Sequence, residues 1–198
     1  MINVSIHPLA NEAVLAARAV REPEAFAAIY DHYFPRVFTY VRLRVDDDST
    51  ADEVTAQIFE RALTKIYKYR PEQAPFGAWL FGIARNTVNN HRRAERRHAW
   101  LSLDFIRHKT VDELHPEDSA VKKEMQDDLL DALGQLSERE RDILSLKYIG
   151  GLTNRRIAGL TGLSESHVGV LVHRSLQYIR KVLEQKEAGD HEDNLSIR

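Results

Sequence analysis

The sequence predicts an all-α protein: two small helical domains joined by a flexible acidic linker, the C-terminal domain carrying a helix-turn-helix. Apolar residues recur at three- and four-residue steps over most of the chain, the period of an amphipathic helix. No strand-like alternation of useful length interrupts them. The periodicity weakens between about residues 99 and 124, where acidic residues surround Pro116. A chain of 198 residues is long enough for two small domains on either side of this break.

In the N-terminal half, a helical stripe begins at Phe26 and continues through Tyr33 to Val41. We expect Pro35 to begin a second helix within it, because proline is tolerated in a first turn. After the loop "DDDST", Thr50 and Glu53 predict a capping box for the next helix. The segment 76–98 then forms a further helix, apolar in its first half and rich in Asn and Arg in its second.

In the C-terminal half, Ser137 and Glu140 predict a capping box. Thr153 can cap a short helix that Gly162 ends at positive φ, and Ser164 can cap a longer helix that follows. A short helix, a turn containing Gly and a longer helix make up a helix-turn-helix. An ordinary helical hairpin with a solvated charged face is the alternative.

Charge is distributed unevenly, although the net charge is only −2. Residues 85–98 carry five arginines against one glutamate, and residues 153–181 carry five basic residues against one acidic residue. Residues 104–131, between them, carry nine acidic residues against four basic ones. Two basic patches separated by an acidic stretch predict two contact surfaces on one polyanion, with arginines for phosphates and asparagines for base edges. The alternative for the first patch, residues 85–98, is the polar end of a helix whose charged side chains face solvent and bind nothing.

Several function classes find no support in the sequence. With no cysteine, disulfides and thiolate metal sites are excluded. No apolar run approaches the ~20 residues of a membrane span, and the N-terminus does not resemble a signal peptide. We therefore expect a cytoplasmic protein without membrane insertion. Nine histidines show no H-E-x-x-H spacing, so we expect no catalytic residues, no metal and no cofactor.

Together these motifs resemble an extracytoplasmic-function sigma factor of bacterial RNA polymerase. The residues that carry the resemblance are 51–63 (ADEVTAQIFERAL), 74–93 (APFGAWLFGIARNTVNNHRR) and 136–176, from LSERERDIL to VHRSL. The resemblance implies sigma domain two in residues 1–98, which binds core polymerase and the promoter −10 element. It implies a linker in 99–124 and domain four in 125–185, which binds the −35 element. We expect residues 186–198 to be a disordered tail.

The resemblance also implies roles for individual residues. The −10 set is Arg85, Asn86, Asn89, Asn90, Arg92, Arg93 and Arg96. The −35 set is Ser164, Glu165, Ser166, His167, Val170, His173 and Arg174. The polymerase-binding set is Asp52, Glu53, Gln57 and Glu60, although a capped first helical turn explains Asp52 and Glu53 equally well.

The implied function is promoter recognition, strand opening and transcription initiation with core RNA polymerase. The implied partners are core polymerase, promoter DNA and an anti-sigma factor. The alternative is an autonomous helix-turn-helix regulator whose N-terminal domain senses a ligand or dimerises. That alternative leaves the Asn- and Arg-rich face of residues 85–97 unexplained.

Overall fold

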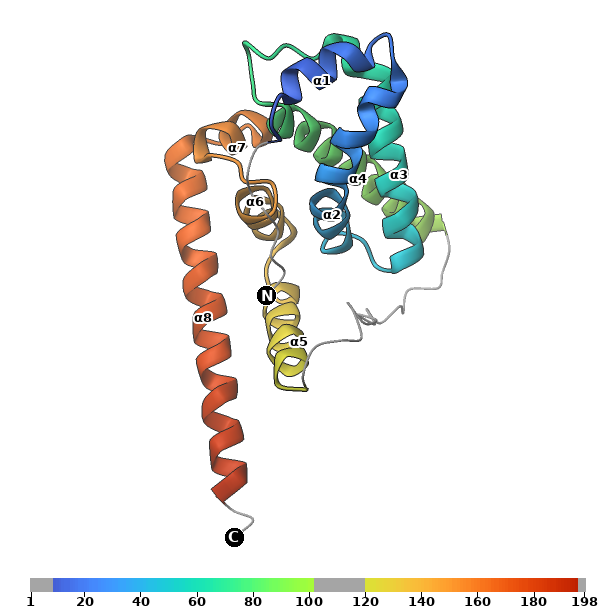
Figure 1. The fold of residues 1–198 in the computed structure, drawn as a ribbon. Helices are drawn as coiled ribbons and strands as arrows, with labels where there is room; N and C mark the ends of the chain where they lie inside the picture. The colour runs from blue at the N-terminus through green and yellow to red at the C-terminus, as the bar shows by residue number, and fades with distance from the viewer. Residues whose placement is uncertain (1–8, 102–119, 196–198) are drawn as a thin grey trace.

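The computed structural model describes residues 9–101 and 120–195, with side chains described for residues 9–97 and 127–186. Every regular element in these ranges is a helix, so the all-α prediction is confirmed for the described residues. Figure 1 shows two groups of helices beside each other: an N-terminal unit, residues 9–101, and a C-terminal unit, residues 120–195. Most of the predicted linker, residues 102–119, lies outside the described residues.

The N-terminal unit is a bundle of α-helices with two short 3-10 turns. In chain order the elements are α1 (Glu12–Ala19), η1 (Pro23–Phe26), α2 (Ala27–Arg42), α3 (Asp48–Lys65), η2 (Ile66–Lys68) and α4 (Phe76–Leu101). The apolar stripes of α2, α3 and α4 meet in one core, where Ile29, Ile58 and Phe81 are fully buried. The Glu12 carboxylate closes the α1 end by accepting hydrogen bonds from Tyr33 Oη (2.7 Å) and from the backbone N–H of Phe76 (3.0 Å).

Pro35 lies inside α2, so the prediction that it begins a second helix is wrong. In a helix interior proline lacks the N–H donor and clashes with the carbonyl four residues back, at a cost of roughly 3 kcal/mol. The two halves of α2 nevertheless share one buried stripe, with Ile29 and Tyr33 before the proline and Val37 and Val41 after it. The core contacts of both halves therefore outweigh the lost backbone hydrogen bond.

Helix α3 begins at Asp48, and its N-cap is Asp47. The Asp47 carboxylate accepts hydrogen bonds from the backbone N–H of Thr50 (2.8 Å) and from its hydroxyl (2.9 Å). The predicted Thr50–Glu53 capping box is therefore wrong, since Thr50 already lies in the first turn. An ionised Asp at the N-cap also interacts favourably with the positive end of the helix dipole, which a Thr cap does not.

The C-terminal unit consists of α5 (Ala120–Gly134), α6 (Glu138–Tyr148), α7 (Asn154–Thr161) and α8 (Glu165–Leu195). The predicted Ser137–Glu140 capping box is present at the start of α6. Figure 1 shows α5 and α8 extending together away from the N-terminal unit, with α6 and α7 next to it. Ile143, Leu146 and Ile157 are buried in the core of this unit, together with Val168 of α8.

Helix α8 continues to Leu195, beyond residue 185, where the sequence analysis placed the end of the second domain. Once a helix is formed, each further residue adds a hydrogen bond at low cost, and Glu, Gln, Lys and Ala favour this extension. Lys186 also links α8 to α5 by donating to Asp131 Oδ2 (3.0 Å) and pairing with Asp128.

Candidate nucleic-acid interface

Helix α4 carries all seven residues assigned to −10 binding, in its second half. Its first half is buried, with Phe76, Leu80 and Phe81 fully covered by the N-terminal unit. The second half is polar on the sides that face away from that core. Asn86, Asn90, Arg93 and Arg96 are exposed there, and Arg85, Asn89 and Arg92 are half-buried. The change in composition along α4 therefore follows the boundary of the hydrophobic core.

Three of these arginines contact the C-terminal unit. Arg85 donates from Nε to Asp142 Oδ2 (2.7 Å) and from Nη1 to the carbonyl of Leu160 (2.6 Å). Arg92 and Arg96 both pair with the carboxylate of Glu138. Acidic groups of α6 thus occupy cations that the sequence assigned to the promoter.

Asp142 is the centre of the contact between the two units. Its side chain is only 7% exposed, and its carboxylate accepts a hydrogen bond from Tyr40 Oη (2.8 Å). It also pairs with Arg44 of the N-terminal unit and with Arg85. Removing one partner of such a buried pair costs about 3–5 kcal/mol, because the other charge remains buried without compensation.

Arg36 of α2 also joins the two units, by donating hydrogen bonds to backbone carbonyls at the C-terminal end of α6. Its guanidinium donates from Nε to the carbonyl of Ile149 (2.9 Å) and from Nη2 to the carbonyl of Gly150 (2.7 Å). The last carbonyls of a helix have no partner within the helix and carry its negative dipole end. A buried cation at this point satisfies two acceptors and the dipole together.

The contact between the units shifts the pKa values of Arg92 and Glu138. Burial lowers the pKa of Arg92 from its ordinary value, and the charge of Glu138 partly opposes this shift. Burial would raise the pKa of Glu138, but the hydrogen bond from Arg96 and the charges of Arg92, Arg96 and Arg141 lower it overall. Because a guanidinium keeps its proton in proteins even when burial lowers its pKa, and because the pKa of Glu138 is lowered, Arg92 and Glu138 meet as full charges at neutral pH.

The C-terminal unit has the predicted helix-turn-helix geometry. Thr153 caps α7, and Gly162 ends it in the left-handed region with φ 74°. Ser164 Oγ then accepts from the backbone N–H of His167 (3.2 Å) at the start of α8. Val168 and Val172 anchor α8 in the core. All seven residues of the −35 set are exposed on α8 or at its N-cap: Ser164, Glu165, Ser166, His167, Val170, His173 and Arg174.

The predicted polymerase-binding residues lie on the outer side of α3. Asp52, Glu53 and Glu60 are exposed, and Gln57 is half-buried and donates from Nε2 to Glu53 Oε1 (3.1 Å). Because α3 begins at Asp48, Asp52 and Glu53 stand beyond its first turn. Compensation of the helix dipole, which falls off within the first turn, therefore does not account for them.

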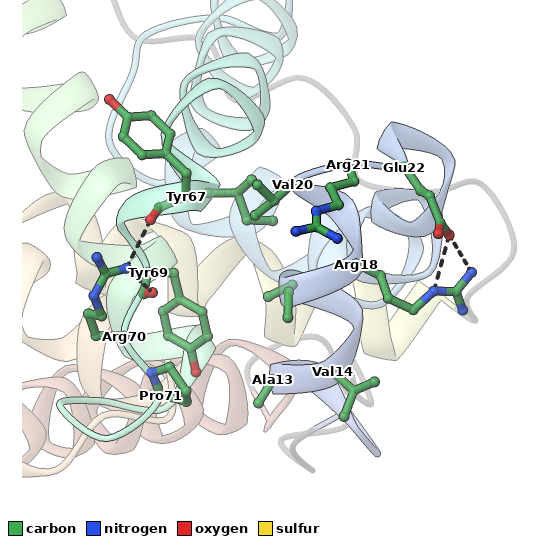
Figure 2. Close-up of a pocket in the computed structure, with 13 residues that line it drawn as sticks. Ala13, Val14, Arg18, Val20, Arg21, Glu22, Tyr67, Tyr69, Arg70 and Pro71 are labelled. Atoms are coloured by element: carbon green, nitrogen blue, oxygen red, sulfur yellow. Dashed lines mark hydrogen bonds and ion pairs between the residues drawn. The ribbon is translucent and has the colours of Figure 1, made fainter.

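Two of the grooves that the described residues form lie beside the N-terminal unit. One, of about 720 Å³, lies between α1 and the η2 segment, and none of its lining residues belongs to the predicted sets. Figure 2 shows its rim, where Arg18 pairs with Glu22 and Arg70 donates to the backbone oxygens of Tyr67 and Tyr69. The other groove, of about 860 Å³, lies between the units and is lined by Asn86 and Trp79 of α4 and by Arg155 and Arg156 of α7.

Sequence reasoning missed the groups that join the units, above all Asp142, Arg36 and Arg44. Each carries a sequence signal of the same kind. Asp142 stands one turn before the fully buried Leu146, and Arg36 and Arg44 each stand one turn from the buried Tyr40. A charged residue in register with an apolar stripe indicates a buried partner of opposite charge. The position of that partner depends on the tertiary structure.

Two features are absent from residues 9–101 and 120–195, the part of the chain that the structure describes. In those ranges no group of three or more His, Cys, Asp or Glu side chains could hold a metal ion. None of the helices described there is long and apolar enough to cross a membrane.

Two sequence families match the chain, one in each unit. Residues 29–98 match the family described as Sigma-70 region 2, and residues 126–179 match Sigma-70, region 4. The first match covers α2 to α4 with the whole −10 and polymerase-binding sets, and the second covers the helix-turn-helix.

Individual relatives agree with these matches. The chain is 30% identical over 162 residues to the ECF RNA polymerase sigma factor BldN of Streptomyces coelicolor, covering 82% of this chain. It spans 61% of the length of BldN, which is therefore a longer protein. It is 27% identical over 184 residues to the ECF RNA polymerase sigma factor SigD of Mycobacterium tuberculosis, covering 91% of this chain and 86% of SigD.

Solved structures share the fold. Sigma factor RpoE of Bartonella quintana, solved with the anti-sigma factor NepR, matches with a TM-score of 0.70 and 19% identity over 80% of this chain and 96% of the RpoE chain. CnrH, solved with the cytosolic domain of CnrY, matches with a TM-score of 0.63 and 22% identity over 87% of this chain and 96% of the CnrH chain. The paired helical units are therefore an arrangement found in other proteins.

Proposed function

The chain belongs to the sigma-70 family, in its ECF group, and from this premise we propose that it binds core RNA polymerase and directs promoter recognition, strand opening and transcription initiation. The observation that carries this proposal is the joint presence of two basic surfaces on separate helical units, within matches to regions 2 and 4 in family order. An autonomous helix-turn-helix regulator would not require a region 2 match over residues 29–98.

In the proposed division of labour, the exposed Asn and Arg face of α4 contacts the −10 element as its strands separate. The exposed N-terminal part of α8 contacts the −35 duplex, and the acidic outer side of α3 contacts polymerase. Backbone phosphates position such a complex and base edges specify it. The protein thus acts by binding, without covalent chemistry and without a cofactor, in the cytoplasm where polymerase and promoter DNA are found.

A separate anti-sigma protein is a further partner in this proposal. Support comes from RpoE and CnrH, whose solved structures contain NepR and the cytosolic domain of CnrY. This chain offers such a partner two exposed basic surfaces and the groove between α1 and η2. A pull-down from non-induced cells should return a stoichiometric protein that is lost on induction.

The direct test is runoff transcription with sigma-free bacterial core polymerase and a library of promoter fragments. We expect the chain to yield transcripts with defined starts on a subset of the library. The matched variant Asp52→Lys/Glu53→Lys should lose at least about tenfold in transcript yield, because it reverses the charge of the proposed polymerase surface. No transcript from any library member, together with no co-purification with core enzyme, would show that the proposed function is wrong.

For the −35 surface, we expect Arg174→Ala to weaken binding of the polymerase complex to duplex promoter DNA and to lower the slope of log K against log salt by about 0.9, the loss of one phosphate contact. Arg180→Ala, an exposed arginine on the same helix six residues further on, is the charge-matched control. Its slope should equal that of the wild type. Equal slopes for wild type and both variants would remove Arg174 from the phosphate contacts.

A further inference from the structure

A groove of about 860 Å³ lies between α4 of the N-terminal unit and α7 of the C-terminal unit. We propose that this groove is a binding site for a free nucleotide, with two arginines of α7 on the phosphates and Trp79 of α4 against the base. This inference goes beyond the proposed function, because it assigns the chain a small-molecule ligand. Its test requires neither polymerase nor promoter DNA.

Facing sides of α4 and α7 form the groove, and Figure 1 shows these two helices beside each other. The lining residues recur at the helical period. On α4 they are Ala78, Trp79, Gly82, Ile83 and Asn86, and on α7 they are Arg155, Arg156, Gly159 and Leu160. The helices touch at Gly82, where an added Cβ would stand 3.3 Å from Leu160 Cδ2, whereas a Cβ at Gly159 would meet no atom within 4 Å. The groove is therefore open beside Gly159, and its volume lies within the ~300–1,000 Å³ of small-molecule sites.

The groove carries positive charge without compensation. Among the described residues that line it, Arg155 and Arg156 are the charged ones, and both are exposed. Neither guanidinium makes a hydrogen bond or an ion pair within the described part of the chain. They do not stabilise α7 either, because they lie in its first turn, where a cation interacts unfavourably with the helix dipole. A phosphate group suits this pair, since its oxygens accept hydrogen bonds from the guanidinium fork.

Trp79 gives the same groove a flat aromatic surface. Its indole is half-buried and packs against Tyr69 and Phe76, with ring centroids 5.5 Å and 5.2 Å away. These two contacts hold the indole in place before a ligand arrives, so its binding would lose little side-chain freedom. Nucleobases stack on aromatic side chains whatever their sequence, because every base has a π-face. The groove therefore offers a platform for a base next to two cations for phosphates.

Two amide side chains in the lining distinguish a nucleotide from simpler anions. Gln73 and Asn86 are both exposed, and an amide both donates and accepts hydrogen bonds, as the edge of a base requires. Inorganic phosphate would use the arginines alone and leave the indole uncovered. A carboxylate with an alkyl chain would leave the amides without a polar partner. A heteroaromatic ring joined to phosphates uses all three kinds of lining group.

The experiment follows the fluorescence of Trp79 in the full chain during titration with ATP at constant ionic strength. The chain has two tryptophans, so Trp100→Phe leaves Trp79 as the only fluorescent indole. ATP should quench it saturably, with a Kd below about 1 mM. Isothermal titration calorimetry of the wild-type chain with ATP should give the same Kd. Adenosine and inorganic triphosphate should each bind at least about tenfold more weakly, because each carries one of the two linked contacts.

Three variants test the groove itself. Arg155→Gln/Arg156→Gln should weaken ATP binding at least about tenfold, because charge-assisted hydrogen bonds to phosphate are lost. The charge-matched control Arg139→Gln/Arg180→Gln removes two exposed arginines of the same unit that lie outside the groove, and it should bind within about twofold of the wild type. Gly159→Leu keeps both groove arginines but fills the open space, so it should also lose at least about tenfold. Circular dichroism should show it folded, since leucine favours a helix interior more than glycine.

Each contrary outcome overturns the site for a different reason. If neither fluorescence nor calorimetry detects saturable binding of ATP, the groove takes no nucleotide. Equal losses in the two arginine pairs, or wild-type affinity in Gly159→Leu, would mean attraction to charge and not binding in the groove. Inorganic triphosphate that binds as tightly as ATP would refute the base contact. Saturable quenching by a mixed-sequence DNA oligonucleotide without binding of ATP would assign the two arginines to nucleic acid instead. Transcription assays enter none of these results, so they leave the proposed function to its own test.

Discussion

Phe81→Ala is expected to lower the free energy of unfolding of the N-terminal unit by about 3–5 kcal/mol, the usual cost of deleting a buried aromatic ring. Phe81 is fully buried and packs edge-on against Tyr40, with ring centroids 5.6 Å apart. The Arg36 guanidinium lies 5.6 Å from the centre of the same ring. The truncation therefore leaves a cavity beneath the groups that hold the two units together.

Thermal unfolding of the full chain followed by circular dichroism measures this effect, with a drop in Tm of more than about 10 °C expected for a unit of this size. Tyr67→Ala is the control, an aromatic residue of the same unit that is 56% exposed. It should change the stability by no more than about 0.5 kcal/mol. A Tm for Phe81→Ala within a few degrees of the control would mean that the core closes over the missing ring.

Gly162→Val is expected to destabilise the C-terminal unit by about 1–3 kcal/mol and to abolish specific binding to the −35 duplex. Gly162 has φ 74°, a conformation that a β-branched residue adopts only under strain. No atom lies within 4 Å of an added Cβ, so the cost comes from the backbone and not from a clash. The strain falls on the turn that sets α7 and α8 at their relative angle.

Gly159→Ala is the matched control, since Gly159 lies inside α7 and an added Cβ there also meets no atom within 4 Å. That substitution should stabilise the unit by about 0.5–1 kcal/mol, because alanine favours a helix interior more than glycine. Hydrogen exchange of the α7 and α8 amides separates the two variants. Unchanged amide protection in Gly162→Val would show that the turn absorbs the strain without opening.

The local features of this fold follow closely from neighbouring residues. The Ser137–Glu140 capping box, the Thr153 cap and the positive φ of Gly162 were all predicted, because each depends on a few residues in one turn. In the two cases where the prediction was wrong, either a better N-cap residue nearby or packing in the core determined the local structure. Asp47 replaced Thr50 as the cap of α3, and the core packing of α2 carried that helix through Pro35.

The candidate site likewise has features that the sequence predicts and features that depend on tertiary packing. The exposed −35 residues on α8 and the polar half of α4 follow from helical period and charge, since a surface stripe repeats every three to four residues. The burial of Arg85 and Arg92 against α6 cannot be predicted from this helical repeat. It depends on residues some 46–57 positions further along the chain, at Glu138 and Asp142.

The sequence by itself determined the all-α class, the division into two helical units, the helix-turn-helix and the identity of the basic faces. These properties rest on local hydrogen bonds and on the hydrophobic period of single helices. Only the tertiary structure decided which cations on those faces are occupied. Asp142, Glu138 and Arg36 make contacts between the two units. Which residues pair across such a contact depends on how the units pack in three dimensions, because the residues next to each partner in the sequence do not indicate where the other partner lies.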